Sequence, residues 1–319
     1  MDAVLDLAKQ VDQTSEPKHI SVLNGGFSSL AYEVAIPNNP FVLLFERENA
    51  ASNANYGHTF VVLTLLERHG FVHAPRPLWV KDDLKAIAMS FAEGTPSHEF
   101  KFRQRRVSPK LLAVKVMDSL LDTASISLAE YQKLAAELNV VSSPVRTTQD
   151  EVKQFGTDWF TIVEQSCPDQ AIIDWLRPKI EQSAQLAQQV GNHEPAFGHD
   201  DPSSGNILVQ QDGSFTLIDW HSACFHTTGP EFFIAYTTHT TDFMRPYRQA
   251  LILHVAERLG LSATELTERV HEFRRYTEVF DINWAAMMMA KVSSGKIVGD
   301  IDNFRNIAME RIAIYEKSF

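Results

Sequence analysis

The sequence predicts an α+β fold in which a small, β-rich N-terminal region precedes a larger, mainly helical region. Two observations support this division. Apolar runs typical of strands dominate up to about residue 90, and long stretches with helical periodicity follow from about Pro96 onward. A chain of 319 residues has room for two domains or for one unit with two lobes. We therefore expect an N-terminal lobe at 1–94 and a C-terminal lobe at 95–319.

Strands around a single helix are expected in the first region. The segment HISVLNGGFSSLAYEVAI contains two β-rich runs separated by Gly25 and Gly26, which is typical of a hairpin. PFVLLFE and LKAIAMSF are further strand candidates, and the second is ended by the breaker residues EGTP. Between them, Asn53 or Asn55 can cap a helix that ends at Gly70. The apolar face of this helix consists of Phe60, Leu63, Leu65 and Leu66.

The second region has helix-start signals at Ser127 and Ser262, each followed three residues later by a glutamate. Its centre is the exception. The segment 197–220, FGHDDPSSGNILVQQDGSFTLIDW, has no helical periodicity. It contains one clear hairpin, in which NILV and FTLI are joined through Asp212 and Gly213.

Composition and charge exclude several classes of protein. Apolar residues make up 44% and charged residues 22%, as in an ordinary globular protein. No apolar run approaches the roughly 18 residues that span a bilayer, and the N-terminus has no basic leader pattern, so we expect a cytoplasmic protein without a membrane partner. The net charge of −11 argues against nucleic acid and mildly favours neutral or cationic ligands. The two cysteines predict no disulfide framework, and nothing in the sequence indicates an oligomeric state.

Three polar residues around the central hairpin carry the chemistry. If Asp212 and Gly213 form a two-residue turn, Asn206 lies directly opposite Asp219. An amide and a carboxylate oxygen are ligands that suit Mg²⁺. Asp201 lies in the loop that enters the same hairpin. Phosphoryl transfer needs such a set, because metal ligands neutralise the phosphates and a separate carboxylate accepts the proton of the attacking hydroxyl.

Each feature also has an ordinary structural interpretation. An Asp-Gly pair is common in hairpin turns whatever the function of the protein, and an Asp or Asn before a strand is commonly a cap or a turn residue. The histidines near Asp219 could instead serve a transition-metal hydrolase, although no HxH or HxxxH spacing supports that reading. These histidines are His199, His221 and His226. The ordered combination of features, rather than any single one, favours phosphoryl transfer.

The string HDDPSSGNILV followed by LIDW resembles the motif HGDLHPGNIL…IDW of the aminoglycoside phosphotransferase and choline kinase families. The resemblance implies a bilobal, protein kinase-like fold and a kinase that phosphorylates a hydroxyl of a small-molecule acceptor. Asp201 would be the catalytic base, Asn206 and Asp219 the Mg²⁺ ligands, and His199 a brace for the loop. The acceptor itself is not identified, beyond the slight preference for a cation that the charge suggests.

Two segments of the N-terminal region also resemble the nucleotide-binding segments of these families. GGFSSLAYEV resembles their phosphate loop, GGxSNxTYxV, and AMSFAEG resembles their hinge. The resemblance implies that ATP or GTP is the donor. The residues implied to cover its phosphates are Gly25, Gly26, Ser28 and Ser29, and those implied to hold its base are Ser90, Phe91 and Ala92.

The chain departs from the family pattern at three places. The strand Lys or Arg that contacts the α and β phosphates aligns with Leu44, and its helix Glu aligns with Thr59. An acidic position after the metal Asp is filled by Phe233 or Ile234. The transfer residues are complete, whereas the phosphate contacts are weakened. The alternative hypothesis is therefore a non-catalytic, kinase-like protein that binds a nucleotide or another ligand.

Overall fold

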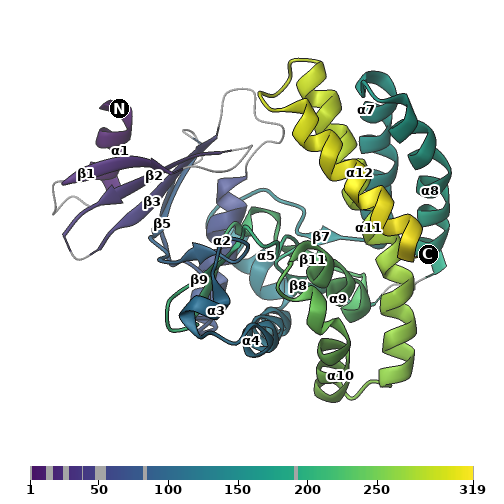
Figure 1. Ribbon diagram of the computed structural model, residues 1–319. Helices are drawn as coiled ribbons and strands as arrows, with labels where there is room; N and C mark the ends of the chain where they lie inside the picture. The colour runs from purple at the N-terminus through teal and green to yellow at the C-terminus, as the bar shows by residue number, and fades with distance from the viewer. Residues whose placement is uncertain are drawn as a thin grey trace. The chain divides into compact units, whose positions relative to one another are not determined.

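The computed structural model describes residues 2–11, 17–23, 29–37, 39–46, 55–81, 85–189 and 193–318. An antiparallel N-terminal sheet and a mainly helical C-terminal part confirm the predicted α+β class (Figure 1). The chain groups into two compact units, Met1–Pro144 with Phe197–Cys224 and Val145–Ala196 with Phe225–Phe319. These units do not coincide with the predicted lobes, whose boundary after residue 94 stays a prediction.

A five-stranded antiparallel sheet forms the N-terminal part of the first unit, in the order β1-β2-β3-β5-β4. The strands are β1 (His19–Leu23), β2 (Ser29–Ala35), β3 (Phe41–Glu46), β4 (Pro77–Lys81) and β5 (Ala86–Ser90). The sequence pattern predicts all of these except β4. In β3, alternate side chains point to opposite faces of the sheet. Phe41 and Leu43 are buried in the apolar cluster on one face, so Leu44, between Ala31 and Ile87 in register, points to the other face.

Helix α1 (Asp2–Val11) packs against this sheet, and the sequence analysis does not predict it. Val4, Leu7 and Ala8 are buried in one cluster with strand residues such as Val34 and Leu43. Their spacing of three and four residues places them on one side of a helix. Val11 continues this spacing and packs against the same cluster, but the pattern extends over only ten residues, which is short for a helix recognised from sequence alone.

Helix α2 (Tyr56–Arg68) is the helix predicted within the N-terminal region. Asn55 is its N-cap, and the Asn55 Oδ1 atom accepts a hydrogen bond of 2.9 Å from the backbone N–H of His58. Asn53 lies outside the described residues. Gly70 follows the helix with φ +71°, as expected for a glycine that ends a helix. Leu63, Leu65 and Leu66 are buried, which confirms the main part of the predicted apolar face.

The rest of the first unit surrounds the central segment. Its helices are α3 (Phe102–Arg105), α4 (Pro109–Asp122) and α5 (Leu128–Glu137), and its strands are β6 (Thr95–Pro96), β8 (Ala196–Gly198), β9 (Ile207–Val209) and β10 (Phe215–Leu217). Both hydrogen bonds of the predicted capping box are present: the Ser127 side chain accepts from the backbone N–H of Glu130, and the Glu130 side chain accepts from the backbone N–H of Ser127. Strands β10, β9 and β6 form a small sheet, which begins directly after Gly94.

The hairpin β9–β10 exists, but its predicted register is wrong by one residue. Leu217 faces Ile207, and the backbone N–H of Ile218 donates to the carbonyl of Asn206 at 2.9 Å. Asn206 therefore lies opposite Ile218 and not opposite Asp219. The reason is the turn: Gln210 N–H donates to Ser214 O, so three residues form the loop instead of two, and Gly213 takes φ +83° at its end.

The second unit is mainly helical. It contains α6 (Thr148–Glu151), a π-helix (Val152–Asp158), α7 (Trp159–Ser166), α8 (Gln170–Gln189), α9 (Gly229–Thr240), α10 (Arg248–Leu259), α11 (Ala263–Ser293) and α12 (Ile301–Ser318). Strand β7 (Val145–Arg146) pairs in parallel with β11 (Cys224–His226) at Phe225 and His226. Ser262 caps α11 as predicted, accepting from Glu265 N–H at 3.3 Å. Among the described residues, no helix is long and apolar enough to cross a membrane.

Residues of α11, α7, α8 and α12 build the core of the second unit. Val279, Ile282 and Met289 of α11 are almost completely buried in one cluster with Val163 of α7 and Leu176 of α8. Because α11 contributes to this cluster over several turns, it is the central helix of the unit. The apolar cluster of the N-terminal sheet is separate from this one.

Gly94 and Gly70 form a matched pair for a stability test, because both have positive φ but different surroundings. A Cβ atom at Gly94, where φ is +146°, would lie 2.9 Å from Leu208 Cβ, whereas one at Gly70 would meet nothing within 4 Å. We expect Gly70→Ala to lower the free energy of unfolding by about 1 kcal/mol through backbone strain alone. Gly94→Ala adds a steric clash to that strain, for a loss of about 3 kcal/mol. Urea unfolding measures both, and equal losses would contradict the close packing of Gly94 on β9.

Candidate active site

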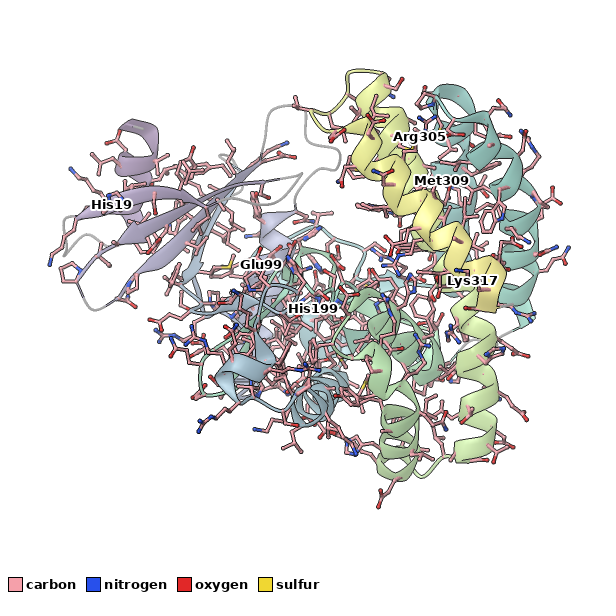
Figure 2. All side chains as sticks on the ribbon, in the orientation of Figure 1. His19, Glu99, His199, Arg305, Met309 and Lys317 are labelled. Carbon is pink, nitrogen blue, oxygen red and sulfur yellow. The ribbon has the colours of Figure 1, made fainter. Side chains whose placement is uncertain are left out.

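His199 connects the loop after β8 to the end of β10 (Figure 2). Its Nε2–H donates to the carbonyl of Ile218 at 2.9 Å, and its Nδ1 accepts from the backbone N–H of Asp201 at 3.3 Å. The ring is fully buried and lies 4.3 Å from the ring of Trp220. Burial lowers the pKa of His199 to about 4, so the imidazole is neutral. Both ring nitrogens are engaged, which removes His199 from any transition-metal site.

Asp201 and Asn206 lie at the two ends of the same loop and are hydrogen-bonded to each other. The Nδ2 atom of Asn206 donates to the backbone carbonyl and to the carboxylate Oδ2 of Asp201, both at 2.9 Å. With its nitrogen used in this way, Asn206 keeps Oδ1 for another ligand. Burial, together with the charges of Asp219 and Asp200, raises the pKa of Asp201 to about 6. Asp201 is therefore a carboxylate that binds a proton more readily than an exposed aspartate does.

Asp219 follows β10 in a left-handed backbone conformation, with φ +65°. It does not face Asn206 across the hairpin, yet its charge raises the pKa of Asp201, so the two carboxylates are close in space. Burial alone would raise the pKa of Asp219, but the hydrogen bond and charge of His221 lower it below its usual value. His221 Nδ1 contacts Oδ1 of Asp219, and its Nε2 lies 3.1 Å from Ser222 Oγ. Asp219 is thus ionised and keeps Oδ2 for a further ligand.

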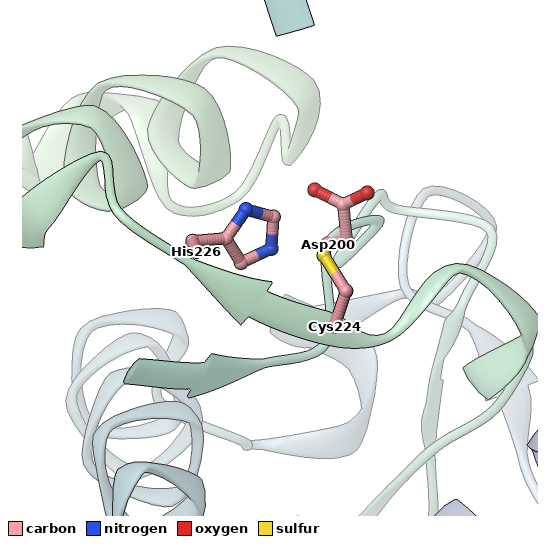
Figure 3. A group of neighbouring side chains, drawn as sticks. All are labelled: Asp200, Cys224 and His226. Carbon is pink, nitrogen blue, oxygen red and sulfur yellow. The ribbon is translucent and has the colours of Figure 1, made fainter. Parts of the chain in front are cut away.

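Asp200, next to the proposed base, also has a left-handed backbone with φ +68°. Its carboxylate lies within 4.8 Å of the sulfur of Cys224 in β11 (Figure 3). The charge of Asp200 contributes to the raised pKa of Asp201. The centre of the first unit therefore gathers three carboxylates, with His221 as a neighbouring cationic group.

The predicted phosphate loop is described in part. Gly25, Gly26 and Ser28 lie outside the described residues. Ser29 begins β2, and its Oγ lies 2.8 Å from the hydroxyl of Tyr56, the first residue of α2. Burial raises the pKa of Tyr56 to about 12, and the charges of Glu46 and Asp219 also contribute. Tyr56 therefore contacts Ser29, the described end of the predicted phosphate loop, a contact that nothing in the sequence indicates.

Two of the three departures from the family pattern, at Leu44 and Thr59, have clear structural counterparts. Thr59 is buried, and its hydroxyl donates to the carbonyl of Asn55 in its own helix at 3.3 Å. It therefore cannot pair with a cation as a glutamate would. Leu44 offers no charge, and Glu46, two residues further along the same face of β3, forms an ion pair with Lys85. Arg47 lies outside the described residues.

The three predicted hinge residues follow or end β5. Ser90 exchanges two backbone hydrogen bonds with the segment before β4: its N–H donates to Arg76 O at 2.9 Å, and its Oγ accepts from Arg76 N–H at 2.8 Å. Phe91 N–H donates to Pro40 O at 3.1 Å. Within the described part of the chain, nothing hydrogen-bonds to the backbone of Ala92. Of the three residues, Ala92 thus has its backbone groups available.

The fold and this arrangement of residues define a protein of the kinase-like class. A choline/ethanolamine kinase family protein from Mesorhizobium loti superposes with a TM-score of 0.68 at 15% identity, over 99% of this chain and 94% of that chain. Spectinomycin phosphotransferase, solved with ADP and spectinomycin, gives 0.63 at 13% identity, over 99% and 98%. An ethanolamine kinase from Plasmodium vivax gives 0.62 at 17% identity, over 98% and 86%. At these identities the likeness establishes the fold alone.

The chain belongs to the phosphotransferase enzyme family, which matches residues 19–273. It is therefore a small-molecule phosphotransferase that acts on a hydroxyl group. Among the curated proteins, none matches the sequence. The predicted family is thereby confirmed, while the roles of the individual site residues stay predictions.

The low pKa of His199 makes stability depend on pH in a defined window. The usual pKa of 6.5 applies to the unfolded chain, and the folded value is about 4. Between these values the unfolded state binds more protons, so stability is complete above pH 6.5 and is lost as pH falls toward 4. The loss is on the order of 3 kcal/mol.

The control is His199→Gln, which retains a donor for Ile218 O but cannot titrate in this range. Urea unfolding at several pH values should show a slope for the wild type that exceeds the slope of the variant by about one proton. Asp219 and His221, whose charges also act on His199, are present in both proteins. Identical slopes would mean that His199 is protonated in the folded protein.

Proposed function

We propose that this enzyme transfers the γ-phosphoryl group of Mg-ATP or Mg-GTP to a hydroxyl of a small acceptor, with Asp201 as the general base. The observation that carries the proposal is the double hydrogen bond from Asn206 to Asp201. It holds the base at a defined position, and it turns the amide oxygen of Asn206 away from the base. One interaction therefore prepares both a proton acceptor and a metal ligand.

The side-chain oxygens of Asn206 and Asp219 suit Mg²⁺ as ligands. Asn206 Oδ1 and Asp219 Oδ2 are hard oxygen ligands of the kind that Mg²⁺ takes, with water and phosphate oxygens for the rest of its shell. The low pKa of Asp219 keeps its carboxylate ionised without a metal. When bound, Mg²⁺ would neutralise negative charge on the β and γ phosphates.

The protein's own groups would then act on the acceptor. The carboxylate of Asp201 orients the acceptor hydroxyl and takes its proton as the new oxygen–phosphorus bond forms. The bond from the γ-phosphorus to the leaving nucleoside diphosphate breaks in the same step. His199 supports this geometry because its Nδ1 accepts from the backbone N–H of Asp201.

The nucleotide would lie between the predicted phosphate loop and the hinge. Ser29 and the loop residues Gly25, Gly26 and Ser28 would cover the phosphates, and Ser90, Phe91 and Ala92 would face the base. The available backbone groups of Ala92 support the hinge assignment, because a purine edge needs a donor and an acceptor. The solved relatives with ADP or GDP support a nucleotide donor. For the acceptor, the net charge of −11 favours a neutral or cationic compound.

Replacing the base tests its role directly. We expect Asp201→Asn to reduce transfer by roughly 10² or more, because an amide cannot accept the hydroxyl proton. Nucleotide binding should change little, since the substitution preserves shape. Release of ADP or GDP with a panel of hydroxyl acceptors measures transfer, and calorimetry measures binding. Undiminished turnover in the variant would remove Asp201 from this role.

Replacing the metal aspartate separates metal binding from nucleotide binding. We expect Asp219→Ala to abolish the strengthening of ATP or GTP binding by Mg²⁺, since the remaining amide oxygen is a weak ligand alone. The matched control is Asp158→Ala, which removes an exposed carboxylate of the second unit that pairs with Lys153. Calorimetric titration with and without Mg²⁺ reads out both variants. A metal effect that persists in Asp219→Ala would place the metal elsewhere.

A further inference from the structure

A cavity of about 390 Å³ lies in the second unit, where α9 begins and where α10 is followed by α11. Its walls are largely apolar, and they include Pro230, Leu259, Leu261 and Leu266. Glu231 also lines the cavity. Phosphoryl transfer as proposed above uses none of these residues.

Glu231 is the unusual member of this group because it is a charged residue with only 1% of its surface exposed. Its Oε1 atom lies 3.1 Å from Nε2 of His193 and 3.6 Å from Nη1 of Arg269. Both partners reach inward from the surface, with side chains 37% and 54% exposed. A buried carboxylate is costly unless a positive group accompanies it. Arg269 is one such group, and the imidazole of His193 is the partner that a bound cation could replace.

The absence of a side chain at Gly229 leaves room for the contact between His193 and Glu231. A Cβ atom there would lie 2.6 Å from His193 Nε2 and 2.9 Å from Glu231 Oε2, and the residue has φ +75°. The positive φ disfavours any other residue at Gly229, and a Cβ atom there would displace the ends of the His193 and Glu231 side chains. His193 is held beside it by its backbone N–H, which donates to Thr227 O at 2.9 Å. The close approach of the imidazole and the carboxylate is thus a property of the backbone.

The apolar side of the cavity comes from the connection between α10 and α11. Gly260 ends α10 with φ +66°, and Leu261 N–H donates back to Ala256 O at 2.8 Å. This turn leaves Leu259 and Leu261 each 44% exposed, while Leu266 is buried beneath them. Exposed leucines that line one concave site commonly mark a place where an apolar group binds.

We propose that this cavity binds a small organic cation, with an ammonium group paired to Glu231 and an apolar body between Leu259, Leu261 and Leu266. Two carboxylates, Glu231 and Glu265, line the cavity against one guanidinium, that of Arg269, and this excess of negative charge disfavours an anion. The bound ammonium replaces the imidazole of His193 as a partner of the buried carboxylate. The inference is independent of the phosphotransferase site, so either can fail without the other.

Three compounds of nearly equal shape test the proposal: cyclohexylamine, cyclohexanol and cyclohexanecarboxylate, titrated into the full-length protein and followed by calorimetry and ligand-observed NMR. The ammonium form should bind with a roughly millimolar Kd, as befits so small a ligand. The alcohol should bind about tenfold more weakly, and the carboxylate should not bind.

The variants locate the site. Glu231→Gln should weaken cyclohexylammonium binding about tenfold, and Leu261→Ser should weaken it several-fold. Leu253→Ser is the matched control, because Leu253 is an exposed leucine of α10 that does not line the cavity. Since Leu261 is already half exposed, its variant tests the site even if Glu231→Gln unfolds the protein. Equal binding of the three compounds, no saturable ammonium binding, or binding that Leu261→Ser leaves unchanged would each overturn the proposal.

Discussion

A buried, neutral histidine supports the arrangement of the active site. His199 accepts from the backbone of Asp201 on one side and donates to the carbonyl of Ile218 on the other. These are the residue proposed as the base and the residue directly before the metal aspartate, Asp219. Two chain segments that enter the site separately are therefore held together by one imidazole. Because burial keeps this ring uncharged, the connection adds no cation to a site that must receive a nucleotide and its metal.

Charge in the first unit is balanced in an unusual way. The strand position at which the family resemblance implies a cation holds Leu44, and the nearby acid Glu46 is paired with Lys85. Asp219 is instead neutralised by His221, which directly follows Trp220. Tyr56 joins the phosphate loop through Ser29. The proposed phosphate contacts therefore rely on the glycine-containing loop, the proposed metal ligands and the hydroxyl groups beside them, with no cation at Leu44.

Much of the fold follows from local signals. Features that depend on residues close in sequence could be predicted. They include the cap at Asn55, the capping box at Ser127 and the glycine after α2. Helix α1 and strand β4 were not predicted, since α1 is short and becomes stable by packing one side on the sheet, and β4 becomes stable by pairing with β5. The error in the hairpin register has a similar cause. One additional loop residue shifts the whole ladder, and an Asp-Gly pair fits both turn lengths.

The sequence by itself determined the α+β class and the family, and it predicted a set of transfer residues because the spacing of His199, Asp201, Asn206 and Asp219 is a linear pattern. Only the tertiary structure decided how these residues are arranged. It showed that Asn206 bonds to Asp201 and that Asp219 reaches the site from a left-handed turn instead of from the facing strand. Likewise, only the fold brings Glu231 and Leu261 to one cavity, since contacts between distant segments depend on packing and burial, which no local pattern specifies.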